Sequence, residues 1–189
     1  MTLETDETHF TTPGQYAIIK LPNTDIEDAF TVSEYDGKRF TTVFKVDDDL
    51  TKHLSTLRLG DVVEVQTGLG NGYNVEIIPD GAVLLADTTG IPQMFGLLRE
   101  LLIRGKQCKL VLGYSSKDRI FMIDPFRNLC NNIEILTADG SNGRQGRAYD
   151  GIRHAEYVCA AGSVEMLDNI AKKADAGQFN LDGMNVTTW

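Results

Sequence analysis

The sequence is poor in cysteine, tryptophan and proline, and it has no long apolar run. Among its 189 residues are three cysteines, five prolines and one tryptophan. No run approaches the roughly 18 apolar residues that a membrane-spanning helix needs. The polar start, Met1 to Thr8, has the features of neither a signal peptide nor a transit peptide. We therefore expect a cytoplasmic protein without a membrane span.

The three cysteines are scattered through the second half of the chain. Cys108 and Cys159 lie in apolar, strand-like segments, and Cys130 stands apart from both. Such positions favour reduced, buried thiols over disulfide or metal ligands. An iron–sulfur cluster needs four closely placed ligands, usually thiolates. The sequence therefore predicts that this chain holds no such cluster.

Positive charge is also in short supply. Eighteen lysines and arginines stand against 27 aspartates and glutamates, which gives a formal net charge of -9. A protein of this charge repels phosphate backbones and anionic headgroups. Neither nucleic acid nor a membrane surface is an expected partner. The apolar content of 42% is nevertheless sufficient for the cores of one large or two small domains.

The first part of the sequence has the residue pattern of short β-strands. Three segments are rich in β-branched and aromatic residues and are separated by turn signals: 14–21, 29–33 and 40–46. Residues 49–57 place three leucines on one helical face, and Gly60 ends this helix before a strand at 62–65. The pattern predicts a small antiparallel barrel or sheet with one short helix.

After Asp80 the pattern changes to alternating strands and helices. Continuous apolar runs, typical of strands buried on both faces, occur at 82–86, 109–114, 133–136 and 156–160. Helical segments lie between or after them, at 92–104, 125–130 and 163–173. The alternation predicts a doubly wound parallel sheet. A short strand or hairpin is expected around Asp182. The core face of the first helix is expected at Met94, Phe95, Leu98, Leu101 and Leu102.

Six short motifs give the chain a resemblance to a known family. They occur in the family's order, at residues 13–16, 67–73, 88–92, 111–118, 138–146 and 161–167. Together they resemble the ferredoxin reductase family and, within it, the electron transfer subunit of dihydroorotate dehydrogenase. The most specific is Thr67-Gly-Leu-Gly-Asn-Gly-Tyr73, which is similar to the Gly-Pro-Leu-Gly-Asn-Gly-Phe loop of that subunit.

The resemblance implies a fold and a chemistry. It implies an incomplete antiparallel flavin-type barrel at 1–79, with the first strand missing ahead of Pro13. A doubly wound parallel-sheet domain of the nucleotide-binding type follows at 80–189. In the family, NADH or NADPH passes a hydride to FAD, and electrons leave through a two-iron two-sulfur cluster to a partner dehydrogenase. Residues 178–189, without cysteine, stand in place of the family's cysteine-bearing segment.

The chain departs from the family's flavin-binding pattern at two acidic positions. Asp28 replaces the arginine that pairs with the pyrophosphate, and Asp48 stands in the element where glycines let backbone amides approach a phosphate. We interpret residues 47–49 as a solvated turn and helix cap, with Asp28 on a sheet edge, in preference to a metal site. The candidate FAD contacts that remain are Thr31, Gly70, Asn71 and Tyr73, although the glycines are equally explained as turn residues.

The nucleotide side departs from the family as well. The family's Gly-Gly-Gly-x-Gly-Ile-Pro turn becomes Ala86-Asp-Thr-Thr-Gly-Ile-Pro92, which puts Asp87 where a pyrophosphate meets a helix N-terminus. The Cys-Gly-Pro motif becomes Ala161-Gly162-Ser163 and loses its thiol. The glycine-rich loop at 139–146 is nearly intact, and a plain surface loop explains it equally well. The candidate NAD(P)H contacts are Gly90, Ser141, Arg144 and Gly162.

These departures leave two main hypotheses. In the first, the chain is like the electron transfer subunit but has degenerate cofactor sites, and it serves as a structural or regulatory partner of a flavoprotein dehydrogenase. In the second, it is an active NAD(P)H-dependent flavin reductase or electron transfer subunit with altered FAD contacts. A nucleotide sensor that uses only the second domain is a third reading.

No cofactor is assigned to the chain: FAD and NAD(P)H remain candidates, and their binding is expected to be weakened by the acidic substitutions. The expected partner is a dehydrogenase or homologous subunit, or a second copy of the chain at the open barrel edge. No catalytic residue and no metal site is predicted, since His9, His53 and His154 each lack a paired carboxylate or serine at a recognisable spacing.

Overall fold

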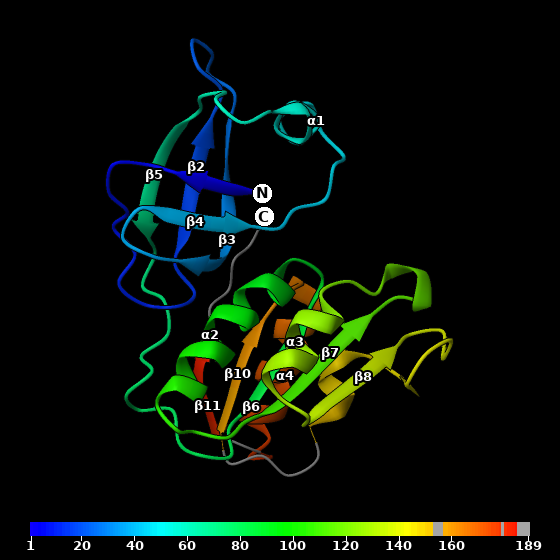
Figure 1. The fold of residues 1–189 in the computed structure, drawn as a ribbon. Coiled ribbons are helices and arrows are strands. Elements are labelled where there is room, and N and C mark those ends of the chain that lie inside the picture. Colours follow the sequence, from blue (N-terminus) through cyan, green and yellow to red (C-terminus); the bar gives the residue numbers. More distant parts are fainter. Residues whose placement is uncertain (153–156, 179, 185–189) are drawn as a thin grey trace. The chain divides into compact units, whose positions relative to one another are not determined.

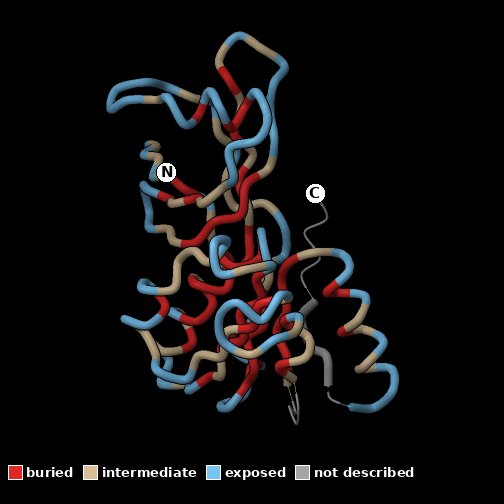
Figure 2. The backbone as a smooth tube through the Cα atoms, turned by 90° about the vertical axis from the view of Figure 1, so that its right-hand side faces the viewer, coloured by how far each residue is buried: buried red, intermediate tan, exposed pale blue. Residues whose placement is uncertain are grey.

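The structure is a computed structural model that describes residues 1–152, 157–178 and 180–184. The chain packs as two units, Met1–Gly72 and Tyr73–Trp189. Figure 1 shows an antiparallel sheet in the first unit and a parallel sheet with helices on both faces in the second. Buried residues follow the strands of both units, and exposed residues follow the connecting loops (Figure 2).

The first unit is a five-stranded antiparallel sheet with the strand order β1-β4-β3-β2-β5. Its elements are β1 (Thr2–Glu4), β2 (Tyr16–Lys20), β3 (Glu27–Tyr35), β4 (Arg39–Thr42), α1 (Asp49–Thr56) and β5 (Glu64–Leu69). Ala17 and Ile19 have no exposed surface and pack with Phe40, and with Leu54 from α1. Because β1 and β5 each pair with one neighbour, the sheet is an open, incomplete barrel, as expected.

A short strand precedes Pro13, which corrects the expectation that the first strand is missing. In β1, Leu3 lies opposite Phe40 of β4 and packs against the core of the first unit. The amino group of Met1 donates to the Thr42 carbonyl oxygen at 2.8 Å. The sequence did not predict this strand, because only one of its three residues has a core side chain. A single apolar residue cannot show the alternation of apolar and polar residues that indicates a strand.

The second unit is a six-stranded, wholly parallel sheet with the order β11-β10-β6-β7-β8-β9. Its strands are β6 (Val83–Asp87), β7 (Lys109–Tyr114), β8 (Ile133–Thr137), β9 (Arg144–Gln145), β10 (Tyr157–Ala161) and β11 (Asn180–Met184). Its helices are α2 (Ile91–Ile103), α3 (Ile123–Leu129) and α4 (Val164–Asp175), with 3-10 turns η1 (Thr88–Gly90), η2 (Lys117–Arg119) and η3 (Ala148–Gly151). The predicted doubly wound parallel sheet is confirmed, and the strand expected around Asp182 joins it as β11.

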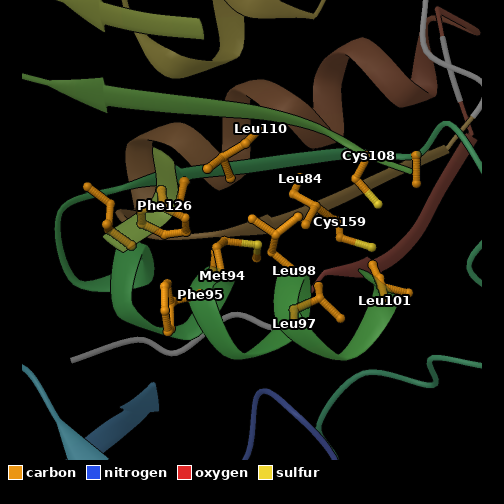
Figure 3. Close-up of a cluster of buried hydrophobic side chains, with 14 of the residues drawn as sticks. Leu84, Met94, Phe95, Leu97, Leu98, Leu101, Cys108, Leu110, Phe126 and Cys159 are labelled. Atoms are coloured by element: carbon orange, nitrogen blue, oxygen red, sulfur yellow. The ribbon is translucent and has the colours of Figure 1, made fainter. Parts of the chain in front are cut away.

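Successive residues of each central strand face opposite sides of this sheet. Leu84 packs in the core that α2 and α3 cover, whereas Val83 and Leu85 pack in the core that α4 covers. Met94, Leu98 and Leu101 of α2 have no exposed surface, Phe95 is 9% exposed, and Leu102 packs at the margin, as predicted (Figure 3). The thiols of Cys108 and Cys159 lie in the same core. None of the helices in the described residues is long and apolar enough to cross a bilayer.

The packing boundary falls ahead of the expected division between residues 79 and 80. Tyr73, Val75 and Ile78 belong to the core of the second unit. The ammonium group of Lys106 also donates to the carbonyl oxygens of Val75 and Ile78, at 2.8 and 2.6 Å. The segment that follows Gly72 is therefore tied to the second unit by both apolar and polar contacts.

Candidate functional site

The second unit has a point where the direction of strand succession reverses. From β6 the chain adds β7, β8 and β9 on one side, and it then returns to place β10 and β11 on the other side. Ligands of open parallel sheets bind beyond the carboxyl ends of the strands at such a point. Here those ends are Asp87 of β6 and Ala161 of β10. The turns that follow them, leading into α2 and α4, form the candidate nucleotide site.

Two of the predicted cofactor contacts, Gly90 and Gly162, meet at this point. A Cβ atom on Gly90 would lie 2.1 Å from the carbonyl oxygen of Ala161, and one on Gly162 would lie 2.1 Å from the Asp87 carboxylate. Gly162 also has a φ of +148°, which residues with a side chain rarely adopt. Glycine at both positions is what allows the two turns to pack this closely.

The carboxylate of Asp87 fills the space between the two turns. Its Oδ1 accepts a hydrogen bond from the Ser163 backbone N–H at 2.6 Å, and its Oδ2 accepts one from the Ser163 hydroxyl at 2.7 Å. Ser163 is the N-cap of α4, and its Oγ accepts from the Met166 N–H at 3.3 Å. Asp87 therefore takes an amide and a hydroxyl that an anion at this helix N-terminus would otherwise use.

Thr88, the next residue, has a left-handed backbone with a φ of +41°. This conformation is a genuine outlier for a β-branched side chain, whereas glycine adopts it readily. Its hydroxyl donates to the Asp87 carboxylate at 3.2 Å. The turn after β6 thus keeps a glycine-like backbone while carrying two polar side chains.

Ser141 and Arg144, the other predicted nucleotide contacts, lie near the opposite edge of the sheet. The Ser141 hydroxyl accepts from the Lys117 N–H at 2.7 Å and donates to the Asp139 carboxylate at 2.6 Å. These bonds from Ser141 hold the pKa of Asp139 below its usual value. Because β9 is three strands away from β6, Arg144 is about 14 Å from the Asp87 turn. The four predicted contacts therefore form two separate pairs.

The guanidinium of Arg144 is engaged in an ion-pair network along the sheet. Its Nε donates to one oxygen of Glu134 at 2.9 Å, and the Lys109 ammonium donates to the other at 2.6 Å. Partial burial acts to raise the pKa of Glu134, but the hydrogen bonds from Lys109 and Arg144 outweigh it and lower the pKa. Arg144 also donates to the Asp150 carbonyl oxygen at 2.7 Å. Sequence reasoning had not identified the partners of Arg144 in this network, which come from two other strands, β7 and β8, and from the turn η3.

In the first unit, the two motifs that carry the flavin-side resemblance lie against each other. The Gln15 side-chain amide donates to the carbonyl oxygens of Gly68 and Gly70, both at 3.0 Å. A Cβ atom on Gly70 would lie 3.1 Å from the Tyr16 ring, and one on Gly72 would lie 2.2 Å from Thr12. The loop after β5 is therefore shaped by close packing on the segment that enters β2.

The three other predicted FAD contacts differ in where they lie. Thr31 is buried in β3 directly opposite Tyr16, so it belongs to the same region as Gly70, and Asn71 follows Gly70 in the exposed loop. Tyr73 is instead 2% exposed in the core of the second unit, and its hydroxyl donates to the Ala160 carbonyl oxygen at 3.0 Å. Burial raises the pKa of this phenol well above its ordinary value.

The two acidic positions singled out in the first unit have structural partners. Asp48 is the N-cap of α1, and its Oδ1 accepts from the Thr51 N–H at 2.7 Å and the Thr51 hydroxyl at 2.8 Å. These bonds lower the pKa of Asp48. Asp28 lies in the part of β3 that pairs with β2 but extends past β4, so that one side of its backbone is a sheet edge. The interpretation as a helix cap and an edge residue is confirmed.

The described residues contain no arrangement of three or more His, Cys, Asp or Glu side chains that could hold a metal ion. His9 and His53 are both exposed, and His154 lies outside the described residues.

Fold and comparisons together define a ferredoxin reductase-like protein. A solved NADH-dependent reduced ferredoxin-NADP oxidoreductase aligns with a TM-score of 0.70 and 27% identity, over 88% of this chain and 63% of that one. Phthalate dioxygenase reductase aligns with a TM-score of 0.71 and 16% identity, over 100% of this chain and 64% of that one. The FAD/NAD-binding domain of a Vibrio cholerae nitric oxide dioxygenase aligns with a TM-score of 0.73 and 14% identity, over 96% of this chain and 91% of that one. The last two likenesses concern the fold alone.

Among curated proteins, the chain is homologous to electron transfer subunits of dihydroorotate dehydrogenase B (NAD(+)). It is 27% identical to the Streptococcus thermophilus subunit in an alignment of 169 residues that covers 82% of this chain and 65% of that protein. It is 31% identical to the Listeria innocua subunit over 144 residues, which are 73% of this chain and 56% of that protein. The chain thus spans less than two thirds of the length of these relatives. It matches no protein-family model.

Proposed function

We propose that this chain is an electron transfer subunit-like protein with degenerate cofactor sites, which acts as a structural or regulatory partner of a flavoprotein dehydrogenase. The observation that carries the proposal is the pair of hydrogen bonds from Ser163 to the carboxylate of Asp87. This carboxylate lies where the fold presents a helix N-terminus to a bound anion.

The electrostatic consequence for a dinucleotide is large. Two unit negative charges 4 Å apart repel by about 4 kcal/mol at an effective dielectric constant of 20. A pyrophosphate at this point would meet that repulsion and would also find the donors of Ser163 already bonded. The residues present do not fit a dinucleotide here, and no hydride-transfer step is assigned to the chain.

The first unit supports the same proposal for FAD. The N-cap position of α1 is filled by the Asp48 side chain, which bonds the Thr51 amide. Asp28, in the place of the family's arginine, offers a negative charge in the position of a cation. FAD binding in the manner of the family is therefore expected to be weak.

A partner role is supported by the relatives, whose names describe them as electron transfer subunits of a dehydrogenase. We include a cytoplasmic location in the proposal, because the buried thiols of Cys108 and Cys159 suit a reducing compartment. That the partner is a dehydrogenase is part of what we propose.

Cofactor binding by the purified chain tests the proposal. A ligand that binds only the native state raises the thermal unfolding midpoint of a protein. We therefore expect a colourless protein whose midpoint is unchanged by 1 mM FAD or NADH. At this concentration, even a cofactor with a Kd of about 10 μM would be present at about 100 times its Kd and would shift the midpoint. The Listeria innocua relative, treated identically, is the comparison protein. Retained yellow flavin, or a midpoint that rises with either cofactor, would overturn the proposal.

One observation favours the second candidate, an active NAD(P)H-dependent flavin reductase with altered FAD contacts. The loop after β5 keeps its left-handed glycines, with Gly70 at a φ of +80° and Gly72 at +64°, and Gln15 fixes it. This loop geometry favours the persistence of a flavin scaffold. NADH consumption that depends on added FAD would support this candidate over the first.

A further inference from the structure

The first unit exposes three large apolar side chains in two connections at one end of its sheet. Leu59, Val62 and Ile26 have relative exposures of 108%, 75% and 46%. Ile26 lies in the hairpin between β2 and β3, and the other two lie in the connection from α1 to β5. These three residues are called the apolar tip. Figure 1 shows both connections beyond the same end of the strands.

Strand pairing fixes this common location. Lys20, the last residue of β2, pairs with Glu27 at the start of β3 and with Glu64 at the start of β5. Ile26 directly precedes Glu27, and Val62 lies two residues before Glu64. Both side chains therefore belong to the segments that extend past the same strand end.

Leu59 is presented by a turn that is bonded from both sides. The Asp61 N–H donates to the Arg58 carbonyl oxygen at 3.0 Å, and the Arg58 N–H donates to the Asp61 carboxylate at 2.7 Å. Gly60 supplies the left-handed backbone that the turn needs, with a φ of +100°. These bonds fix the backbone of the turn, so a partner that binds Leu59 has a smaller backbone entropy cost to overcome.

Negative charge surrounds the apolar tip. The two connections and the adjoining strand ends carry five carboxylates, from Asp25, Glu27, Asp28, Asp61 and Glu64. The cations there are Lys20, which is 3.9 Å from Glu64, and Arg58. An apolar centre with a charged rim is the usual arrangement of a protein–protein docking site.

The whole first unit has the same sign of charge. Residues 1–72 hold 13 of the 27 acidic residues and 6 of the 18 basic residues, so this unit has a net charge of 6 minus 13, or -7, out of -9. Two copies that met through this surface would bring like charges together, which disfavours a second copy as the occupant. A positively charged partner is attracted by the same field.

We propose that the apolar tip is the docking site for a partner protein whose surface offers an apolar pocket bordered by lysines and arginines. The inference rests on the partner role proposed above and names the surface that performs it. Leu59 and Val62 are the anchors that lose water in the pocket, and the surrounding carboxylates steer the approach and select a basic rim.

The test uses the full-length chain and one probe, the purified catalytic dihydroorotate dehydrogenase of the organism that encodes it. The dissociation constant is measured by surface plasmon resonance. Leu59→Glu and Val62→Glu are each expected to weaken binding about tenfold or more, because each puts a charge into a desolvated pocket. Ile103→Glu, at a 71% exposed position of α2, is the matched control and is expected to leave the constant unchanged.

Charge reversal tests the rim separately. Asp25→Lys combined with Glu27→Lys is expected to weaken binding about threefold to tenfold at low salt and to flatten its salt dependence. Asp6→Lys combined with Glu7→Lys makes the same change in net charge at the opposite end of the sheet, since Thr5 and Thr8 bond the turn after β3. This control is expected to have the smaller effect.

The outcomes separate the surface from the partner role. Binding that Leu59→Glu and Val62→Glu leave intact would refute the surface while the partner role stands. No binding by the unchanged chain would refute the partner role and, with it, the occupant assigned to the surface. A stable dimer of the unchanged chain that Leu59→Glu dissolves would show that the occupant is a second copy, against our inference.

Discussion

Asp87, at the carboxyl end of β6, bonds the N-cap residue of α4. Its two carboxylate oxygens bond the amide and the hydroxyl of Ser163, a residue 76 positions away in the sequence. Gly162 and Gly90 keep the surrounding turns close enough for these contacts. At the scale of single residues, both oxygens of this carboxylate thus have a partner within the chain.

Removing this side chain is predicted to restore affinity for anionic nucleotides. In Asp87→Gly the repulsion disappears and the Ser163 donors become free, so the affinity for NADH or ADP should rise at least about tenfold. The free energy of unfolding should fall by about 1 to 2 kcal/mol, because the Ser163 hydrogen bonds are lost. Isothermal titration calorimetry and urea unfolding measure the two effects.

Asp118→Gly is the matched control for this prediction, because it removes an exposed aspartate from the turn after the neighbouring strand β7. Asp118→Gly should neither raise the nucleotide affinity nor lower the free energy of unfolding as Asp87→Gly does. Equal nucleotide affinities for the unchanged chain and Asp87→Gly would show that the carboxylate does not block the site.

Part of this arrangement could be predicted from the sequence. Gly90, Gly162 and the acidic substitution at Asp87 were identified from their motifs, because each sits in a short pattern that a turn requires. The hydrogen bonds between Asp87 and Ser163 could not be predicted, since they depend on β6 and β10 being neighbours in the sheet. Ser141, Arg144 and Tyr73 have intramolecular partners that only the folded chain brings near.

At the scale of elements, periodicity located the long strands and helices. The helix expected at 92–104 forms at Ile91–Ile103, and the strand expected at 109–114 forms at Lys109–Tyr114. The two shortest strands, β1 and β9, were not foreseen, since three or two residues contain no measurable period. These strands are stabilised by neighbours distant in the sequence.

The network that joins β7, β8 and β9 has a predictable pH dependence. Glu134 bonds Lys109 and Arg144, which hold its pKa below the ordinary value of 4.5. A carboxyl with a lowered folded-state pKa contributes stability that is fully present above its ordinary pKa, and this contribution is lost as the pH falls through the folded pKa. Glu134→Gln should therefore reduce the free energy of unfolding at pH 7 by about 1 kcal/mol.

The difference between the unchanged chain and Glu134→Gln should narrow as the pH falls below 4.5 and through the lowered folded-state pKa, because Glu134 then becomes protonated and loses its charge. Urea unfolding followed by circular dichroism from pH 7 to pH 3 measures it. Asp124→Asn is the control, because its pair with Arg127 is exposed and 3.8 Å long, and it should show almost no effect. A difference that is constant across this range would contradict the assigned role of the charge.

At the scale of the whole molecule, the sequence predicted two units of different architecture, because the residue period changes along the chain. It placed their division at 79/80, where the apolar runs of the parallel sheet begin. The structure ties the preceding segment to the second unit through side chains that carry no strand or helix period. Tertiary packing of this kind cannot be predicted from the periodicity of apolar residues along the sequence.

This difference leads to a prediction about fragments of the chain. A fragment of residues 73–189 should fold cooperatively, whereas one of residues 80–189 should be far less stable. The shorter fragment lacks Tyr73, Val75 and Ile78, which are 2%, 8% and 2% exposed, and it also lacks the carbonyl partners of Lys106. Each buried side chain contributes about 1.5 to 3 kcal/mol, so the combined loss of about 4.5 to 9 kcal/mol is comparable with the stability of a whole domain.

Urea unfolding of both fragments, followed by circular dichroism, tests this division. Tyr73→Phe in the longer fragment is the control. It removes the hydroxyl that donates to the Ala160 carbonyl oxygen and should lower the free energy of unfolding by about 1 kcal/mol. Equal midpoints for the two fragments would return the boundary to 79/80 and would make the segment 73–79 a linker. A large difference with a small effect of Tyr73→Phe would show that apolar burial, more than the phenol hydrogen bond, binds this segment to the second unit.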